Sequence, residues 1–219
     1  DRGYLDALQN YQRALKQRNA LLKYFAANRT FQADMLELYD HQLSEYAPVI
    51  FAARNAFAAQ FTPMLQEAYE GISGGREQVE LRYESLLAEQ SMADLLAERL
   101  SKDRVLQFTS AGPHREDLDF TLHGHPLQRV GSQGQQKSFL IALKLAAFEV
   151  LHQALGRKPI LLLDDVFDKL DAQRVEGLIR MVNDHRFGQI FISDTHPERT
   201  AELLKALDQE SVVHELTRA

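Results

Sequence analysis

The sequence predicts a mixed α/β fold, in which a pair of long antiparallel helices precedes an α/β domain. Apolar residues between positions 4 and 57 recur at alternating spacings of three and four, which is typical of amphipathic helices. Four branched aliphatic residues at 160–163 follow one another without polar alternation, as in a parallel strand covered on both faces. The glycine-rich stretch 71–75 separates the two patterns, so we expect domains at 1–72 and 73–219.

The composition sets outer limits on the kind of protein. The 219 residues are 45% hydrophobic, enough for one large domain or two small ones, and the absence of cysteine excludes disulfides and thiolate metal sites. No uninterrupted apolar run is long enough to span a membrane and no signal peptide opens the chain, so we expect a cytoplasmic protein with no membrane partner. The net charge of −6 argues mildly against non-specific binding of nucleic acid.

The first two helices are expected over residues 4–26 and 36–57. Their apolar seams are continuous except at Arg18, which interrupts the first one. A short polar turn joins them, and Thr30 at its end is placed to cap the second helix. A connection this short makes antiparallel neighbours, so the pair should form a helical hairpin. An ordinary helix pair in a globular core is the alternative.

Shorter elements are expected in the rest of the chain. These are strands at 79–83, 106–110, 118–122, 189–193 and 212–213, and helices at 91–102, 172–183 and 199–207. The loop 112–117 could contact nucleotide or DNA, or it could merely hold a turn. Its own charges nearly cancel, which favours the structural role.

Two adjacent carboxylates, Asp164 and Asp165, end the apolar run at 160–163. Ligands of open α/β sheets bind at the carboxyl ends of the strands. A carboxylate pair there suits phosphoryl transfer, in which one carboxylate holds Mg²⁺, directly or through water, and the next orients or activates a water. A strand that ends in a solvated acidic turn would give the same pattern, so the run alone does not distinguish a phosphoryl-transfer site from such a turn.

A second polar stretch, residues 131–137, opens a long helix expected over 133–155. Ser132 is placed to cap this helix and Gly156 to end it. Because the helix is apolar around most of its circumference, we expect it to be buried.

The start of this helix is a candidate anion site. Free backbone N–H groups and the helix dipole act together at Gly134 and Gln135, where glycine lets a phosphate approach the backbone closely. The stretch is not a P-loop, because Gln136 stands where that motif needs glycine and a polar hairpin, not an apolar strand, precedes it.

Four motifs follow one another in the order found in ABC-type ATPases. The stretch Gly131-Ser132-Gln133-Gly134-Gln135 resembles their signature motif, and the strand that ends in Asp164-Asp165 resembles their Walker B strand. Further on, Asp168-Lys169-Leu170-Asp171 resembles the D-loop, and His196, just after the strand at 189–193, resembles the switch histidine. The order and spacing of the four make the signal specific.

Finer features resemble the RecF family of bacterial recombination mediators. They are the variant signature at 132–137, the Asp-Asp end in place of Asp-Glu, and the stretches 11–22 and 111–117. This resemblance covers essentially the whole chain. It implies the C-terminal half of an ABC-type (SMC-like) P-loop ATPase domain plus an α-helical antiparallel hairpin arm. It departs from the family in one way: the amino-terminal part with the Walker A loop is missing from this chain.

The resemblance also implies roles for the motif residues, in a dimer that holds ATP between two protomers. Asp164 would help hold Mg²⁺, Asp165 would act on the attacking water, and His196 would contact the γ-phosphate. The residues that would bind the nucleotide, from across the dimer, are Ser132, Gly134, Gln135 and Lys137. Asp168 and Asp171 would tie the two sites together. His196 could instead be a surface residue that caps a helix.

The implied function is ATP-dependent DNA binding in recombinational repair and replication. Such a protein dimerises on ATP at DNA gaps or junctions, aids recombinase loading and works with RecR- and RecO-type mediators. The full-length protein would be a weak DNA-dependent ATPase, and this chain alone, without Walker A, would be inactive. The alternatives are another SMC-like or ABC ATPase, or a non-catalytic helical adaptor that dimerises through its hairpin. The adaptor explains residues 1–72 and nothing after Gly75.

Overall fold

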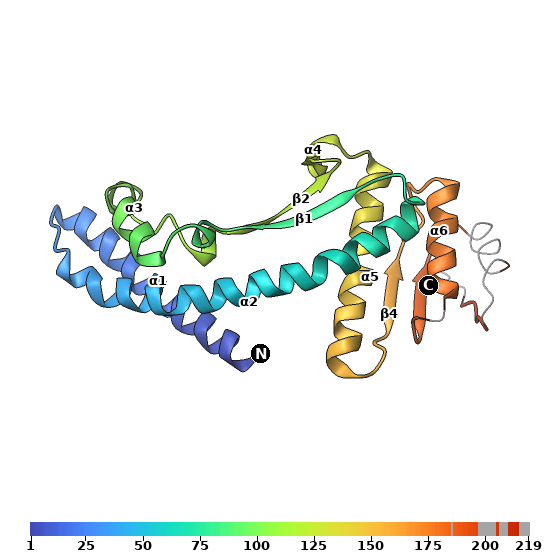
Figure 1. The fold of residues 1–219 in the computed structure, drawn as a ribbon, viewed down its shortest axis with the longest axis horizontal. Coiled ribbons are helices and arrows are strands. Elements are labelled where there is room, and N and C mark those ends of the chain that lie inside the picture. The colour runs from blue at the N-terminus through green and yellow to red at the C-terminus, as the bar shows by residue number, and fades with distance from the viewer. Residues whose placement is uncertain (185, 197–204, 206–209, 215–219) are drawn as a thin grey trace, which may run out of the picture. The chain divides into compact units, whose positions relative to one another are not determined.

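The computed structural model describes residues 1–184, 186–196, 205 and 210–214, and it has a mixed α/β fold (Figure 1). Contacts divide the chain into two compact units. Unit 1 comprises residues 1–59 and 81–119, and unit 2 comprises residues 60–80 and 120–219. This division differs from the expected boundary after residue 72, because α2 (Asp34–Ser73) and β1 (Val79–Glu84) each run from one unit into the other.

Helices α1 (Arg2–Asn28) and α2 form the expected hairpin in unit 1. The chain leaves α1 through Arg29, which has a left-handed backbone with φ 52°. Thr30 was expected to cap α2 but does not, because α2 begins farther along the chain, at Asp34. The N–H of Thr30 instead donates to the carbonyl of Phe25 at 3.1 Å and completes the end of α1. The second helix is also longer than expected, since it continues through Pro48 and Pro63 as one element.

The interface of the hairpin follows the predicted seam. One buried cluster lies far from the turn and contains Ala7, Tyr11, Ala14, Leu43, Ala47 and Ile50, with Met92 and Leu96 of α3 (Met92–Leu106). Another lies near the turn and contains Leu22, Phe25 and Leu36. Residues of α1 near the turn therefore pack on residues of α2 near the turn, which confirms that α1 and the first part of α2 run antiparallel.

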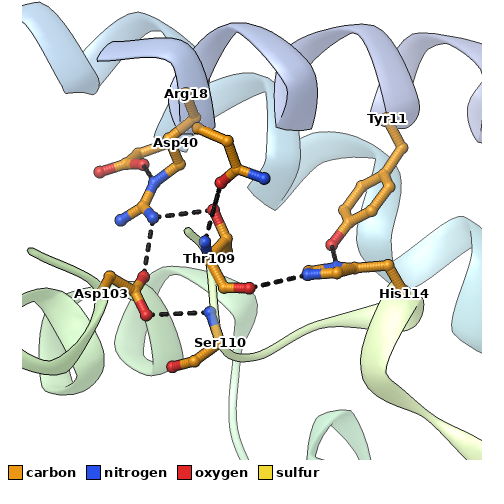
Figure 2. A network of polar contacts seen from close by, with 8 residues as sticks. Tyr11, Arg18, Asp40, Asp103, Thr109, Ser110 and His114 are labelled. Carbon is orange, nitrogen blue, oxygen red and sulfur yellow. Dashed lines mark hydrogen bonds and ion pairs between the residues drawn. The ribbon is translucent and has the colours of Figure 1, made fainter. Parts of the chain in front are cut away.

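The interruption of the seam at Arg18 has a structural reason, shown in Figure 2. Arg18 is fully buried, and its Nη1 donates to Asp103 Oδ2 at 2.7 Å and to Thr109 Oγ1 at 2.9 Å. Its Nε donates to Asp40 Oδ1 at 2.5 Å. The second oxygen of Asp103 accepts from the N–H of Ser110 at 2.9 Å. One guanidinium thus joins α1, α2, α3 and the segment after α3, because a buried charge must be paired and hydrogen-bonded.

A histidine extends the same network (Figure 2). His114 Nε2 lies 2.9 Å from the carbonyl oxygen of Thr109, and Nδ1 lies 2.8 Å from the hydroxyl of Tyr11. A carbonyl can only accept, so Nε2 carries the proton and Nδ1 of the neutral ring accepts from Tyr11. Burial lowers the pKa of His114, which favours this neutral form.

The loop 112–117 has a structural role, as its charge balance suggested. A Cβ at Gly112 would lie 2.4 Å from the hydroxyl oxygen of Tyr11, so only glycine fits there. Arg54 Nη1 donates to the carbonyl of Pro113 at 2.6 Å, and the carboxylate of Glu116 accepts from Tyr83 and Ser85. These bonds fix the backbone of the loop, which carries the short 3₁₀ helix η2 (Pro113–Arg115).

Unit 2 contains the motif-bearing elements. They are α4 (Leu127–Val130), α5 (Gln133–Leu155), β4 (Leu161–Asp164), α6 (Ala172–Asn183) and β5 (Ile190–Ser193), after the hairpin of β2 (Asp117–Leu122) and β3 (His125–Pro126). One sheet has the order β1-β2-β3, and β4 pairs with β5 in parallel. The end of α2 packs closely on α6, because a Cβ at Gly177 would lie 2.5 Å from the carbonyl oxygen of Gly71.

Strand β4 is not covered on both faces, which corrects one expectation. Leu161 and Leu163 are buried, whereas Ile160 is 60% exposed and Leu162 is 64% exposed. On β5, Phe191 is also 52% exposed. The parallel pairing expected for the apolar run is present, but only one face of it has a covering layer within the described residues.

Helix α5 begins and ends where the sequence indicates, between the caps Ser132 and Gly156. It is only partly buried: Phe139 and Phe148 lie in the core, while Leu140 and Leu151 are about half exposed. By length and composition alone α5 could cross a membrane, with a mean hydropathy of 1.4 over 18 residues, although it contains no uninterrupted apolar run of that length. Core helices of soluble proteins have the same composition, and 39% of this window is buried.

The remaining elements follow the sequence analysis in part. The strands at 79–83, 118–122 and 189–193 and the helices at 91–102 and 172–183 are confirmed to within a few residues. The segments 106–110 and 212–213 form no strand. The helix expected at 199–207 lies outside the described residues, apart from a single helical position, Lys205.

Replacing Arg18 tests the network of unit 1. Arg18→Ala leaves the carboxylate of Asp103 buried and unpaired, so we expect the free energy of unfolding to fall by about 3–5 kcal/mol in urea denaturation followed by circular dichroism. Arg13→Ala, on the exposed face of the same helix, should change it by less than about 0.5 kcal/mol. Equal losses for the two variants would contradict the role given to Arg18.

The pKa of His114 gives a prediction on pH. A lowered pKa in the folded state means that the unfolded chain binds more protons, so this residue stabilises the fold above its unfolded pKa of about 6.5 and loses that effect as the pH falls. We expect the wild type to lose more unfolding free energy than His114→Gln between pH 7.5 and 5.5. The exposed His41→Gln is the matched control and should keep the wild-type slope. Parallel pH profiles for wild type and His114→Gln would refute the assignment.

Candidate nucleotide site

The carboxylate pair lies where two parallel strands end. The register pairs Asp164 of β4 with Ser193 of β5. The hydroxyl of Ser193 donates to the Asp164 carboxylate and accepts from the N–H of Asp165 at 3.2 Å. One hydroxyl thus fixes both acidic residues, although the sequence analysis gave Ser193 no role. Ser193 ends the predicted strand 189–193, and a parallel neighbour of the Asp164 strand would bring it beside Asp164. That position was the signal from which its role could have been predicted.

Asp165 has an unusual backbone, with φ 46° in the left-handed region. Such a conformation is uncommon for a residue other than glycine, and Asp is among the residues that adopt it most readily. The carbonyl oxygen of Asp165 accepts a hydrogen bond of 2.7 Å from Lys137 Nζ. The first turn of α5 is therefore tied to the end of β4, and the ammonium group of Lys137 is engaged within the chain.

The switch-histidine candidate lies at the corresponding end of β5. The N–H of His196 donates to Asp194 Oδ1 at 3.1 Å, and His196 Nδ1 lies 3.6 Å from the same oxygen. The Asp194 side chain is 2% exposed and that of His196 is 64% exposed. A buried carboxylate therefore holds the backbone at His196 and leaves the imidazole at the surface. Asp194 is a second residue whose contribution the sequence analysis did not assign.

The acidic edge fits Mg²⁺ only in company with other ligands. No group of three or more His, Asp or Glu side chains that could hold a metal ion occurs in the described residues. Mg²⁺ is commonly bound by one or two carboxylates together with water and substrate phosphates, so a complete protein cage is not required. Asp164 could be one such ligand, with the remaining positions filled by water and phosphate oxygens.

The signature segment, residues 131–137, forms the first turn of α5 and a reciprocal capping box. Ser132 Oγ accepts from the N–H of Gln135 at 3.2 Å, and Gln135 Oε1 accepts from the N–H of Ser132 at 2.8 Å. The geometry of a helix start leaves the N–H groups of Gln133 and Gly134 without acceptors inside the helix. These donors, together with the positive end of the dipole, suit an anion.

Gly134 allows a close approach, but of the protein's own backbone. A Cβ at this position would lie 3.1 Å from the carbonyl oxygen of Lys169, tighter than ordinary contact. Lys169 itself has φ 60°, so the D-loop segment, residues 168–171, turns sharply where it meets α5. Within this chain the glycine brings the signature segment and the D-loop segment together, and its approach to a phosphate stays a prediction.

The other D-loop residues have different surroundings. Asp171 caps α6: its Oδ1 accepts from the N–H of Arg174 at 2.9 Å and its Oδ2 lies 3.3 Å from Arg174 Nε. The side chain of Asp171 is nevertheless 65% exposed, and Asp168 is half-buried. Among the predicted residues, the structure therefore brings together Gly134 with the D-loop segment and Lys137 with Asp165.

A charged pair next to the signature segment was missed from the sequence. Glu77 Oε1 accepts from Gln135 Nε2 at 2.9 Å and from Arg174 Nη2 at 2.6 Å, and its other oxygen accepts from the hydroxyl of Tyr69. Burial opposes ionisation of Glu77, but these three donors outweigh it and hold its pKa below the ordinary value. Contacts across 58 and 97 positions of sequence leave no local pattern that could have revealed the pair.

Comparisons in sequence agree with the motif assignment. Over 209 residues the chain is 52% identical to the DNA replication and repair protein RecF of Flavobacterium johnsoniae, with coverage of 95% of this chain and 58% of that protein. The RecF protein of Parabacteroides distasonis is 44% identical over 218 residues, which is 100% of this chain and 59% of that protein. No protein-family model matches the chain.

Solved structures give the same result. The recombination mediator RecF with ATP, described as part of the RecFOR pathway, superposes with a TM-score of 0.75 at 29% identity and covers 90% of this chain and 54% of that one. A second structure of the mediator, named RecF-ATPrS, gives a TM-score of 0.74 at 28% identity. The chain thus spans little more than half the length of the relatives it matches. It belongs to the RecF family of DNA replication and repair proteins.

Proposed function

We propose that this chain is the part of an ATP-dependent recombination mediator that carries the acidic edge and the signature segment of its nucleotide sites. The observation that carries the proposal is the pairing of two phosphate-suited features in unit 2. Asp164 and Asp165 end β4, and the capped start of α5 reaches them through the 2.7 Å bond of Lys137 to Asp165. The ATP named for the related solved structures supports the same ligand here.

The two carboxylates take different roles. Asp164, whose side chain accepts from Ser193, keeps a second oxygen for Mg²⁺ or for a water bound to it. Asp165 lies one residue farther from the strand, in a turn fixed through its backbone N–H and carbonyl. In this proposal the carboxylate of Asp165 orients the attacking water, and His196 at the neighbouring strand end contacts the γ-phosphate.

The signature segment serves the nucleotide held by a second protomer. Ser132 and the first N–H groups of α5 offer donors to a phosphate, as a helix start does in many phosphate sites. The ammonium group of Lys137 supports Asp165 through one hydrogen bond to its carbonyl, and its remaining donors serve the nucleotide in this proposal. Asp168 and Asp171, which flank the turn at Lys169, connect the two nucleotide sites of the dimer.

The wider activity follows from family membership. A RecF-type protein that dimerises on ATP would bind DNA at gaps or junctions in the cytoplasm, act with RecR- and RecO-type mediators and aid recombinase loading. The membership of RecF in the RecFOR pathway, stated for the solved relatives, supports these partners. A purely helical adaptor would leave the capped, phosphate-suited start of α5 and the acidic strand end unexplained.

Removing one carboxylate tests the assignment of Asp165. In the full-length protein, Asp165→Asn should lower the rate of ATP hydrolysis by about 10²-fold or more, because an amide cannot take a proton from or orient the water as the carboxylate does. ATP-driven dimers should persist, because Asp164 still serves the metal. Phosphate release and light scattering measure the two effects. Loss of ATP-induced dimers in this variant would show that the roles of Asp164 and Asp165 are exchanged.

A bulky cation at the signature cap tests the dimeric site. Ser132→Arg should leave ATP binding by the monomer intact and abolish ATP-dependent dimerisation, because an arginine side chain occupies the place where the partner's phosphate docks. Loss of the cap alone should cost about 1 kcal/mol of stability. Nucleotide titration, thermal melting and sedimentation on one preparation separate these effects.

The matched control for this test is Ser91→Arg, at the cap of α3, where Ser91 also accepts from a backbone N–H. It should lower the melting temperature by a similar amount and leave dimerisation unchanged. A Ser132→Arg protein that melts slightly lower but still dimerises on ATP would refute the signature assignment.

A further inference from the structure

Glu77 and Arg174 form a largely buried ion pair next to the signature segment, with side chains that are 15% and 11% exposed. We propose that Glu77 and Arg174 are positioning residues that hold the signature segment against the D-loop segment within one chain. This inference rests on the proposed function, because it assigns these two residues to the geometry of the same nucleotide site. Neither of them touches the nucleotide in this proposal.

Glu77 holds the signature segment from outside the α5 helix. It accepts from Gln135 Nε2 at 2.9 Å, while the oxygen of the same amide accepts from the N–H of Ser132 at 2.8 Å. Both ends of the Gln135 side chain are therefore used within the chain. Gln135 accordingly fixes the orientation of the helix start.

Arg174 links the carboxylate of Glu77 to the D-loop segment. Its Nη2 donates to Glu77 at 2.6 Å, its Nη1 donates to Ser138 Oγ at 3.1 Å, and its Nε lies 3.3 Å from Asp171 Oδ2. Ser138 in turn donates to the carbonyl of Gly134 at 2.8 Å. One planar guanidinium thus contacts α5, the cap of α6 and the segment before β1, a geometry that lysine cannot reproduce.

This bridge maintains one close contact. Gly134 and the carbonyl of Lys169 lie so close that a single added methyl group would crowd them at 3.1 Å. Arg174 Nε lies 4.0 Å from the same added methyl position, so the guanidinium borders the contact. A small displacement of either segment would separate the backbone donors at the start of α5 from the D-loop turn.

The charge state of the pair agrees with a permanent bridge. Burial disfavours both charges, but hydrogen bonds with Glu77 and Tyr69 outweigh it and raise the pKa of Arg174, and the same network lowers the pKa of Glu77. Both groups therefore stay charged at neutral pH. A buried pair of this kind is weak evidence of added stability, and its best-attested use is to specify one arrangement over others.

The test is a dimerisation assay on the full-length protein. Arg174→Met keeps the length of the side chain and removes its donors. We expect it to weaken ATP-dependent dimerisation about tenfold or more, measured by sedimentation well below the melting temperature, with ATP affinity of the monomer changed less than about twofold. Glu77→Gln should weaken dimerisation in the same direction. The double variant should be little worse than Arg174→Met, because both residues act through one bridge.

Arg180→Met is the matched control, on the same helix, where Arg180 pairs with the exposed Glu176. It should dimerise as the wild type does. If Arg174→Met does not fold, Arg174→Lys and Glu77→Gln replace it, and the expected loss of dimerisation is the same in direction. Wild-type dimerisation by the folded variants, or additive effects in the double variant, overturns the proposal.

Ser132→Arg, run in the same assay, separates this proposal from the proposed function. If Ser132→Arg abolishes dimers while Arg174→Met dimerises normally, only the positioning roles are wrong. If Ser132→Arg also dimerises normally, the signature assignment itself fails, and the positioning proposal fails with it.

Discussion

The pairing of buried guanidinium groups is the constraint on which both units depend. A charge removed from water must find hydrogen-bonding partners, and a guanidinium with five N–H donors can find them on several segments at once. In unit 1 the fully buried Arg18 joins three helices and a loop. In unit 2 Arg174 joins the signature helix, the D-loop and the segment before β1. Each arginine thereby fixes elements that apolar packing alone would hold less specifically.

Local signals in the sequence predicted most of the elements correctly. The helix cap at Ser132 lies where its spacing indicated, because a cap depends on residues only three positions apart. The heptad seam placed the hairpin for the same reason. The parallel pairing of the Asp164 strand followed from its unbroken aliphatic run and its position after a helix.

Relations between distant segments could not be predicted in this way. The break of the seam at Arg18 had no meaning until Asp103, 85 positions away, was seen beside it. Thr30 has the residue type of a cap, yet its N–H completes α1, because the left-handed turn at Arg29 directs it backward. The expectation that β4 is covered on both faces was also wrong. An apolar run shows that a strand could be buried on both faces, but it does not show which segments would bury it.

The motif residues of the candidate site have two kinds of role: some hold the chain in place, and others are proposed to meet the ligand. Gln135, Lys137 and Asp171 direct their polar atoms mainly at their own chain, where they hold a helix start, a strand end and a helix cap. In the proposed function, the hydroxyl of Ser132, the carboxylate of Asp165 and the imidazole of His196 are the groups that meet the ligand. A sequence motif cannot separate structural residues from ligand-binding residues, because both roles require the same residue type at the same spacing. The separation comes from donor and acceptor arithmetic, in which each side chain has a fixed number of hydrogen bonds to give. In the proposed function, these internal bonds set the geometry in which the ligand-binding groups meet a phosphate.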